Sequence, residues 1–235
     1  MQELPNDRRI MALDLPGAGY SERPLKADVS FAGLANVVAK AIFVLGLHKP
    51  VLLGHSHGGA VVLRLGASHP DLVSALVLLC PAHPFSNHED LLVRFYLSSV
   101  GRVFARCLPL LPRQALMFAF KRMPGSRASF GYDELGPYLH TLRTPDTVPH
   151  LLRLLGSWHS DMSQLGRELV DQPLSVPTLL LWGDRDIIVP LSTASGLTQH
   201  LANAKLLPLL GVGHLPNEEA PAECARAITE WLAEL

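Results

Sequence analysis

The sequence predicts an α/β fold, in which a mostly parallel sheet is flanked by helices. Short apolar runs that suit buried strands occur at residues 50–53, 76–80, 176–182 and 206–210. Between these runs lie segments with helical spacing of their apolar residues. Alternation of the two patterns is typical of parallel strands joined by crossover helices.

The helical segments carry start and stop signals. Residues 30–46 place apolar side chains at helical intervals, with Ser30 suited to the N-cap and Gly46 at the end. Residues 60–68 form a second helix, which must close before Pro70 because proline disfavours helix at the preceding residue. A last helix begins at Pro221. Its apolar face is Cys224, Ile228, Trp231 and Leu232.

Composition favours a globular chain without a polyanionic partner. The 235 residues are 48% hydrophobic and 17% charged, which is enough to bury a substantial core. The net charge of −1 gives no reason to expect nucleic acid or an anionic membrane as partner. Oligomeric state is left open. No stretch suits a membrane span, and the polar start shows no signal peptide.

The cysteines favour a reducing compartment. Cys80, Cys107 and Cys224 are odd in number, lack zinc-type spacing and suggest reduced, buried thiols. A cytoplasmic location is therefore expected, although a truncated chain could have lost a signal peptide. No cofactor or metal is expected. His55, His57 and His83 invite a metal hypothesis, but the elbow would point His55 and His57 in different directions, and no Glu or Asp neighbour supplies a third ligand at helical spacing.

Residues 54–58 read Gly-His-Ser-His-Gly and follow the first apolar run directly. Gly-x-Ser-x-Gly at a strand-to-helix junction is the pattern of a nucleophile elbow, which presents Ser56 at the carboxyl end of a sheet. A triad then needs an acid and a histidine later in the chain. Asp184 and Asp186 follow one apolar run and compete for the acid's role, and His214 follows another.

The chain resembles the α/β-hydrolase superfamily over essentially its whole length. Residues 14–21 (DLPGAGYS) resemble the family's Asp-x-Pro-Gly-x-Gly-x-Ser loop, and residues 54–58 its elbow. Residues 183–186 resemble its Gly-x-x-Asp acid loop, and residues 213–219 its histidine loop. The resemblance implies Ser56 as nucleophile, Asp186 as acid and His214 as base, with Asp184 as a turn residue.

The same resemblance implies one oxyanion donor, the backbone N–H of His57, which follows the nucleophile. The family's second donor comes from a loop after its third strand. Residues 10–15 resemble the fourth strand, so strands one to three lack counterparts in this sequence. Either the chain is N-terminally truncated, which we favour, or the fourth strand pairs directly on the fifth.

A helical insertion is expected between strands six and seven of the family. It would divide the chain into a core of residues 1–82 and 172–235 and a cap of residues 83–171. In the family such a cap shapes the substrate pocket. Possible lining residues are Phe95, Tyr96, Phe118, Phe120, Trp158 and Met162, although packing of the cap on the core is the favoured interpretation for any single one.

The predicted activity is a serine hydrolase that cleaves a small or medium carboxylic ester of apolar acyl or aromatic character. Carbon–carbon bond hydrolases and haloperoxidase-like enzymes resemble the chain at the same motifs, whereas a serine nucleophile argues against the dehalogenase and epoxide hydrolase branches. The other hypothesis is a non-catalytic chain of this fold, supported by the missing oxyanion loop.

Overall fold

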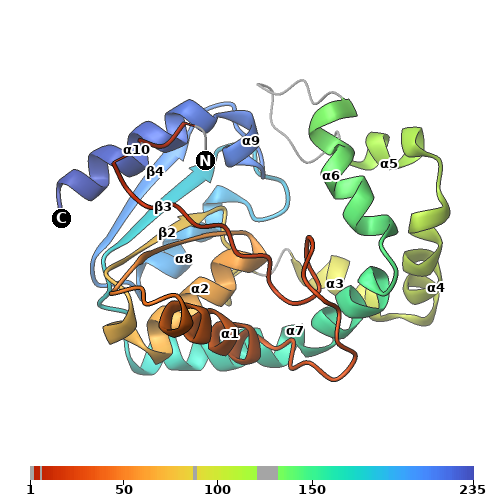
Figure 1. Cartoon of the computed structure of the whole chain (residues 1–235), viewed down its shortest axis with the longest axis horizontal. Helices are drawn as coiled ribbons and strands as arrows, with labels where there is room; N and C mark the ends of the chain where they lie inside the picture. Colours follow the sequence, from red (N-terminus) through yellow and green to blue (C-terminus); the bar gives the residue numbers. More distant parts are fainter. Residues whose placement is uncertain (1–2, 6, 87–88, 121–131) are drawn as a thin grey trace.

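The computed structural model describes residues 3–5, 7–86, 89–120 and 132–235. Its sheet has the strands β1 (Val51–His55), β2 (Ala75–Leu79), β3 (Thr178–Gly183) and β4 (Ala204–Leu209). All pair in parallel in the order β1-β2-β3-β4, with Leu53 opposite Val77 and Leu181 opposite Leu207. The α/β fold with a parallel sheet is confirmed (Figure 1).

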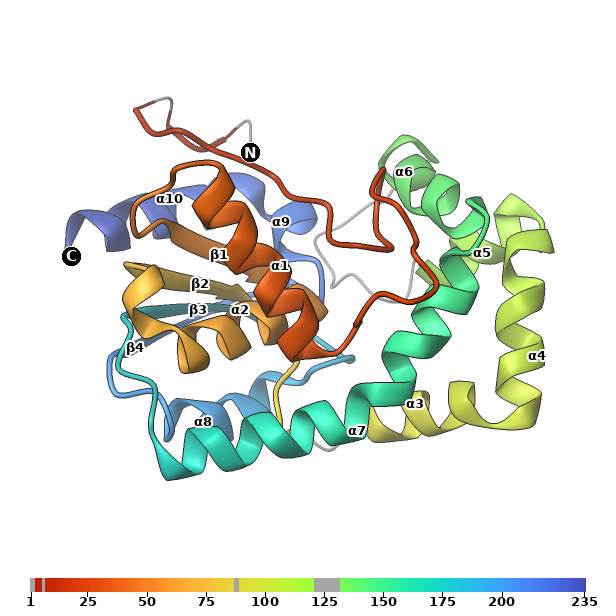
Figure 2. The same cartoon turned by 60° about the horizontal axis from the view of Figure 1, so that its bottom comes forward.

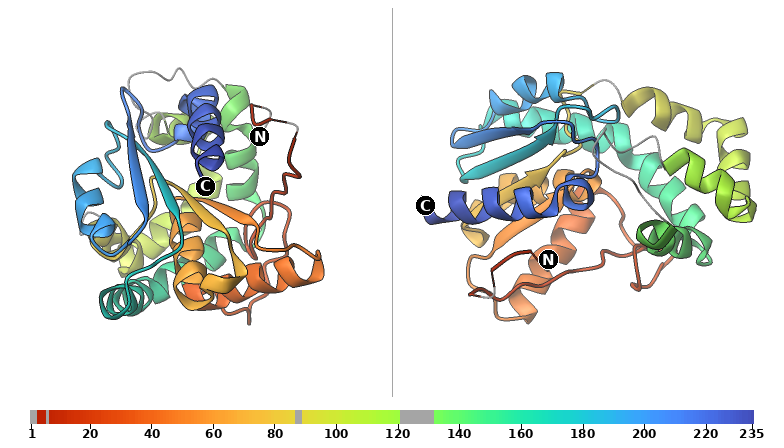
Figure 3. Two further views of the ribbon diagram at one scale, coloured as in Figure 1. Left: turned by 90° about the vertical axis from the view of Figure 1, so that its left-hand side faces the viewer. Right: turned by 90° about the horizontal axis from the view of Figure 1, so that it is seen from above.

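Helices cover both faces of the sheet. On one face lie α1 (Phe31–Val44), α2 (His57–Ser68) and α8 (Ala194–Thr198), and on the other lies α10 (Pro221–Ala233), as Figure 3 shows. A short helix, α9 (Pro216–Glu219), precedes α10. The predicted N-cap of α1 is observed, because the Ser30 hydroxyl accepts the Gly33 N–H at 3.0 Å.

The core has one apolar cluster on each face because side chains alternate along each strand. Leu76 and Leu78 of β2 face α1 and α2, whereas Val77 and Leu79 face α10. All these strand side chains are buried. Burial on both faces explains why the central strands read as continuous apolar runs rather than as alternating ones.

The segment between β2 and β3 is helical. It contains α3 (Glu89–Leu97), α4 (Ser99–Cys107), α5 (Arg113–Phe120), α6 (Tyr132–Arg143) and α7 (Thr147–Asp171). Figure 2 shows α7 running from beneath the sheet out to α3 and α6. Leu165 and Leu169 in the second half of α7 are fully buried in the core cluster, so this helix ties the insertion to the sheet.

The Asp14–Ser21 loop precedes α1 in the sequence and extends toward α7. The Asp14 carboxylate accepts the Tyr20 N–H at 2.9 Å and thereby closes the loop. Gly19 has φ +47°, and a Cβ there would lie 2.2 Å from the Asp14 carboxylate, so only glycine suits the turn. Arg23 then donates to the Thr147 hydroxyl at 2.8 Å, at the start of α7.

The strand expected at residues 10–15 is absent from the described sheet, and so is its direct pairing on the elbow strand. This segment instead runs past the open edge of β1, and a cavity of about 630 Å³ separates them. Ile10 and Met11 line one side, and Val51 and Leu53 the other. The prediction fails because an apolar run forms a strand only where a neighbouring strand lies within hydrogen-bonding distance.

The expectation of three buried thiols is wrong for one of them. Cys80 and Cys224 are buried free thiols, but Cys107 is exposed because it lies at the outer end of α4. Among the described residues, no helix is both long and apolar enough to cross a membrane.

The thiols should therefore differ in reactivity. Burial, followed by the Asp186 charge, raises the pKa of the Cys80 thiol well above its usual value, and burial raises that of Cys224 to about 12. In the native chain we expect Ellman's reagent to titrate Cys107 rapidly and the other two only after denaturation. The Cys107→Ser variant should then show no rapid phase, and a persisting one would contradict this assignment.

Candidate active site

Ser56 lies at a sharp junction between β1 and α2. Its backbone has φ 49° and ψ −118°, a left-handed conformation that non-glycine residues rarely adopt. The conformation is held from both sides, because the Ser56 N–H donates to the Leu79 carbonyl and the Ser56 carbonyl accepts the Ala82 N–H, each at 3.0 Å. The nucleophile elbow expected from residues 54–58 therefore has the strained geometry that the motif requires.

The glycines around Ser56 differ in how much space a side chain would have at each position. A Cβ at Gly54 would lie 2.4 Å from the Gly58 carbonyl oxygen, and one at Gly59 would lie 2.8 Å from Pro81. A Cβ at Gly58 would meet nothing within 4 Å. The tight turn therefore needs glycine at position 54 and a very small residue at position 59, whereas position 58 has room.

Three side chains from distant parts of the sequence form a hydrogen-bonded chain at the carboxyl ends of the strands. The Ser56 Oγ lies 3.0 Å from His214 Nε2, and His214 Nδ1 lies 2.8 Å from Asp186 Oδ2. Asp186 and His214 are both almost completely buried. Neutral His214 thus donates from Nδ1 to the carboxylate and accepts the serine proton at Nε2.

The structure separates the two candidate acids. The other oxygen of Asp186 accepts the N–H groups of Ile188 at 2.8 Å and Val189 at 2.9 Å, which fixes the carboxylate toward the histidine. Asp184 turns away and accepts the Gly211 N–H at 2.6 Å. Asp184 therefore caps the backbone of the histidine loop. This loop lies further along the chain than the local turn that the sequence suggested as the partner of Asp184.

The loop that carries His214 is held by its neighbours. The Glu219 carboxylate accepts the Gly213 N–H at 2.9 Å and the Leu215 N–H at 3.1 Å, so it brackets His214 on both sides. Gly183 at the end of β3 makes room for this loop, since a Cβ there would lie 2.1 Å from the Gly213 carbonyl oxygen. Glu219 stood in the matched histidine loop, but nothing in its spacing indicated this bracketing.

His57 is the first residue of α2, so its backbone N–H belongs to the free N-terminal turn of a helix beside Ser56. Its ring packs against Phe31 and Trp158, with ring centroids 5.5 and 6.2 Å away. Burial, and then the neighbouring His150, lowers the pKa of the His57 imidazole to about 4. The ring thus belongs to the packing, and the oxyanion role of the amide stays a prediction.

Cys80 lies beside the acid and the base. Its Sγ is within 4.8 Å of ligand atoms of both Asp186 and His214, which is the described group compact enough to hold a metal ion. Its thiol proton points to the Gly213 carbonyl, and Gly183 N–H donates to the sulfur at 3.5 Å. The Cys80 thiol is therefore hydrogen-bonded to the backbone of both the strand end before the acid and the loop that carries the base.

The expected pocket residues lie in different surroundings. Trp158 and Met162 are buried on α7 and line a hollow of about 430 Å³ with Phe85 and Ser86. Phe95 and Tyr96 form a ring cluster with Phe104 in α3 and α4. Phe118 is exposed, and the side chain of Phe120 lies outside the described residues. A substrate-lining role for these residues stays a prediction.

The three histidines of the metal hypothesis point to three different partners. His55 lies near His214, with ring centroids 5.0 Å apart, and His57 packs as described above. His83 packs edge-on against Trp182, and its Nε2–H donates to the Thr193 hydroxyl at 3.0 Å. These contacts belong to separate environments rather than to one ligand set.

The buried imidazole of His83 should make the free energy of unfolding depend on pH. Burial lowers the pKa of its imidazole from 6.5 to about 4, so below pH 6.5 the unfolded chain binds more protons than the folded one. Stability that is fully present above pH 6.5 is therefore lost as the pH falls toward 4, by up to about 3 kcal/mol for this group. Urea unfolding at a series of pH values should show His83→Phe with a shallower acid loss.

The matched control for His83 is His69→Phe, which removes an exposed imidazole at the end of α2. We expect this variant to follow the wild-type pH dependence. An acid slope that is the same in His83→Phe and the wild type would contradict the burial of a neutral imidazole at position 83.

Comparisons with known proteins identify the family of the chain. The family model described as alpha/beta hydrolase fold matches residues 1–221. The chain is 26% identical to the uncharacterized hydrolase YugF of Bacillus subtilis over 226 residues, covering 95% of this chain and 80% of YugF. It is 29% identical to 2-hydroxymuconate semialdehyde hydrolase of Pseudomonas sp. over 243 residues, covering all of this chain and 80% of that enzyme.

Other relatives are longer. The chain spans 64% of three similar uncharacterized proteins of Mycobacterium bovis and Mycobacterium tuberculosis. The crystal structure of Cfl2 from Burkholderia cenocepacia matches the fold with a TM-score of 0.81 and 20% identity, covering 93% of this chain and 76% of that one. With the family match extending over most of its length, the chain belongs to the alpha/beta hydrolase fold family.

Proposed function

We propose that the chain is a serine hydrolase that cleaves a small or medium carboxylic ester through an acyl-enzyme intermediate. The observation that carries this proposal is the continuous hydrogen-bonded chain from Ser56 through His214 to the buried carboxylate of Asp186. Such a chain turns a weakly nucleophilic hydroxyl into a nucleophile, because the imidazole accepts its proton as the oxygen attacks.

Each group has one role in the reaction. Ser56 Oγ attacks the ester carbonyl carbon, and its proton passes to His214 Nε2. The ionised Asp186 stabilises the imidazolium, and the His57 N–H with the N-terminal end of α2 stabilises the oxyanion. The imidazolium then protonates the leaving alkoxide, and the acyl group stays on Ser56. A water molecule, deprotonated by His214, finally releases the carboxylic acid and restores the serine.

The helices between β2 and β3 are proposed to act as the cap that selects the acyl group. They follow the loop of residues 80–86, whose Ala82 N–H bonds the nucleophile's own carbonyl. A cap attached beside the serine can position an apolar group over it, and the proposed bounds of this cap are residues 83–171. The proposed substrate is therefore an uncharged, apolar small molecule.

A second candidate is hydrolysis of a carbon–carbon bond. It is favoured by the 29% identity to 2-hydroxymuconate semialdehyde hydrolase over the whole of this chain. The same serine, histidine and aspartate could serve such a reaction, so the triad geometry does not choose between the two. The choice depends on the acyl and leaving groups that the site accepts.

The test is a panel of acetyl, butyryl and octanoyl p-nitrophenyl esters, together with 2-hydroxymuconate semialdehyde and a fluorophosphonate probe. Turnover of esters with labelling at Ser56 supports the ester hydrolase. Turnover of the semialdehyde alone supports the carbon–carbon bond hydrolase. A folded chain that reacts with neither substrate and resists the probe contradicts both and favours a non-catalytic member of the fold.

A further inference from the structure

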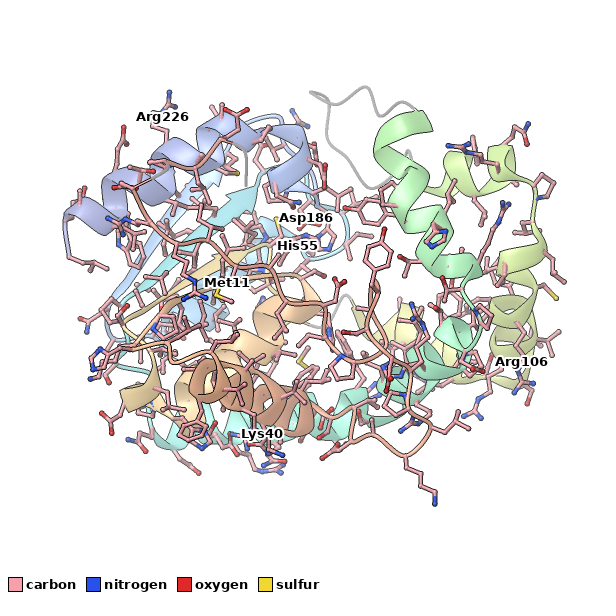
Figure 4. The ribbon with its side chains drawn as sticks, viewed as in Figure 1. Met11, Lys40, His55, Arg106, Asp186 and Arg226 are labelled. Carbon is pink, nitrogen blue, oxygen red and sulfur yellow. The ribbon has the colours of Figure 1, made fainter. Side chains whose placement is uncertain are left out.

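The elbow carries a second histidine whose contact is unused by the proposed reaction. His55 is the last residue of β1 and directly precedes the nucleophile. Its Nε2 lies 2.6 Å from the backbone carbonyl oxygen of His214, although the two residues are 159 positions apart. Figure 4 places His55 beside Asp186 at the carboxyl ends of the strands.

We propose that His55 is a positioning residue, whose ring N–H holds the backbone of His214 so that the imidazole stays between Ser56 and Asp186. The inference rests on the proposed function and adds to it a residue that touches no reacting atom. A carbonyl oxygen only accepts hydrogen bonds, so His55 must carry its proton at Nε2 and donate it.

The sheet topology explains why such a tie is needed. Ser56 follows β1 at one edge of the sheet, whereas His214 follows β4 at the other edge. The histidine loop must therefore cross above β2 and β3 to reach the serine. Glu219 holds the N–H groups on either side of His214, but it belongs to α9 on the histidine's own side of the sheet. The His55 side chain instead links the His214 backbone to β1, the strand that the serine follows.

The charge state of His55 suits this role. Burial, and then the nearby His214, lowers the pKa of its imidazole to about 4, so the ring is neutral where an esterase would work. A cationic ring at this position would oppose the imidazolium that forms on His214 during the reaction. A neutral ring donates the same hydrogen bond without that repulsion.

The test compares three variants. His55→Leu removes the donor and keeps an apolar side chain, whereas His55→Gln keeps a side-chain N–H of similar reach. His69→Leu is the matched control, because this exposed ring at the end of α2 bonds to the hydroxyl of its neighbour Ser68. We expect His55→Leu to lose about 10- to 100-fold in kcat with little change in KM, as misplaced catalytic groups do. His55→Gln should regain most of the loss, and His69→Leu should match the wild type.

A second readout does not depend on turnover. Proton NMR should show a far-downfield resonance from the His214 Nδ1–H that faces Asp186, and His214→Ala assigns it. We expect His55→Leu to broaden or lose this resonance while circular dichroism stays unchanged, and His55→Gln to retain it. If wild-type Ser56 is unreactive, the proposed function fails while this measurement still decides the role of His55.

Two results would overturn the inference. One is a His55→Leu variant with a wild-type resonance and, in an active chain, wild-type kcat. The other is equal loss in His55→Leu and His55→Gln together with a lowered melting temperature in both, which would make the ring a packing element only.

Discussion

Ser56→Ala is expected to lower ester turnover by on the order of 10⁶-fold, the scale at which loss of a serine nucleophile acts in such triads. The substitution removes the hydroxyl oxygen that is proposed to bond covalently to the substrate and that lies 3.0 Å from His214 Nε2. It should also abolish labelling by the fluorophosphonate probe. Steady-state kinetics with p-nitrophenyl butyrate and mass spectrometry of the probe adduct would measure both effects.

The matched control is Ser68→Ala at the far end of α2, where the hydroxyl bonds to backbone carbonyls of its own helix and to the exposed ring of His69, away from the triad. This variant should keep wild-type turnover. Ser56→Gly offers a sharper contrast, because glycine tolerates φ 49° without strain. We expect it to be inactive yet more stable than Ser56→Ala by about 1 kcal/mol in urea unfolding. Retained turnover in either position-56 variant would contradict the nucleophile assignment.

Asp186→Asn is expected to lower kcat by about 10⁴-fold with KM little changed. The amide oxygen can still accept from Ile188 and Val189, so the loop should keep its shape. The amide nitrogen would then face His214 Nδ1, and two donors cannot pair. The imidazole would turn to the other tautomer, whose Nε2 carries a proton and cannot accept one from Ser56.

Asp184→Asn is the matched control, since the two acids are separated by one residue and the substitution is the same. Its amide oxygen can still accept the Gly211 N–H, and its ion pair with Arg185, at 4.0 Å, is largely exposed. We expect turnover within about twofold of the wild type. Comparable losses in both variants would contradict the assignment of Asp186, and the reverse order would transfer the role to Asp184. Initial rates with p-nitrophenyl butyrate decide between them.

Much of the site could be predicted from local patterns. The elbow follows from a glycine-flanked serine between an apolar run and a helical one, and the strand ends locate the acid and base loops. Parallel strands deliver their carboxyl ends to one edge of the sheet, so residues that follow different strands meet there. This rule predicts that Ser56 and His214 lie close together, and in the structure Ser56 Oγ lies 3.0 Å from His214 Nε2.

The same rule does not predict the exposure or pairing of a segment when these depend on other helices and strands of the fold. Cys107 has an ordinary helical context and is exposed at the end of α4. Residues 10–15 carry a strand-like apolar run and a family-like motif, yet no described strand lies near enough to pair with them. In both cases the local sequence sets which structure a segment can adopt, and the neighbouring elements decide whether the segment is buried or paired.

By itself, the sequence determined the α/β class, the elbow and the residue types of the triad, because apolar periodicity and glycine positions act over a few neighbouring residues. The loop pattern left Asp184 and Asp186 open as acids, and the family resemblance favoured Asp186. The tertiary structure shows that Asp186 faces His214, whereas Asp184 bonds to Gly211. It also decided the contact of His55 with the His214 backbone. Contacts between residues far apart in the chain depend on the packing of the whole sheet, which no local pattern encodes.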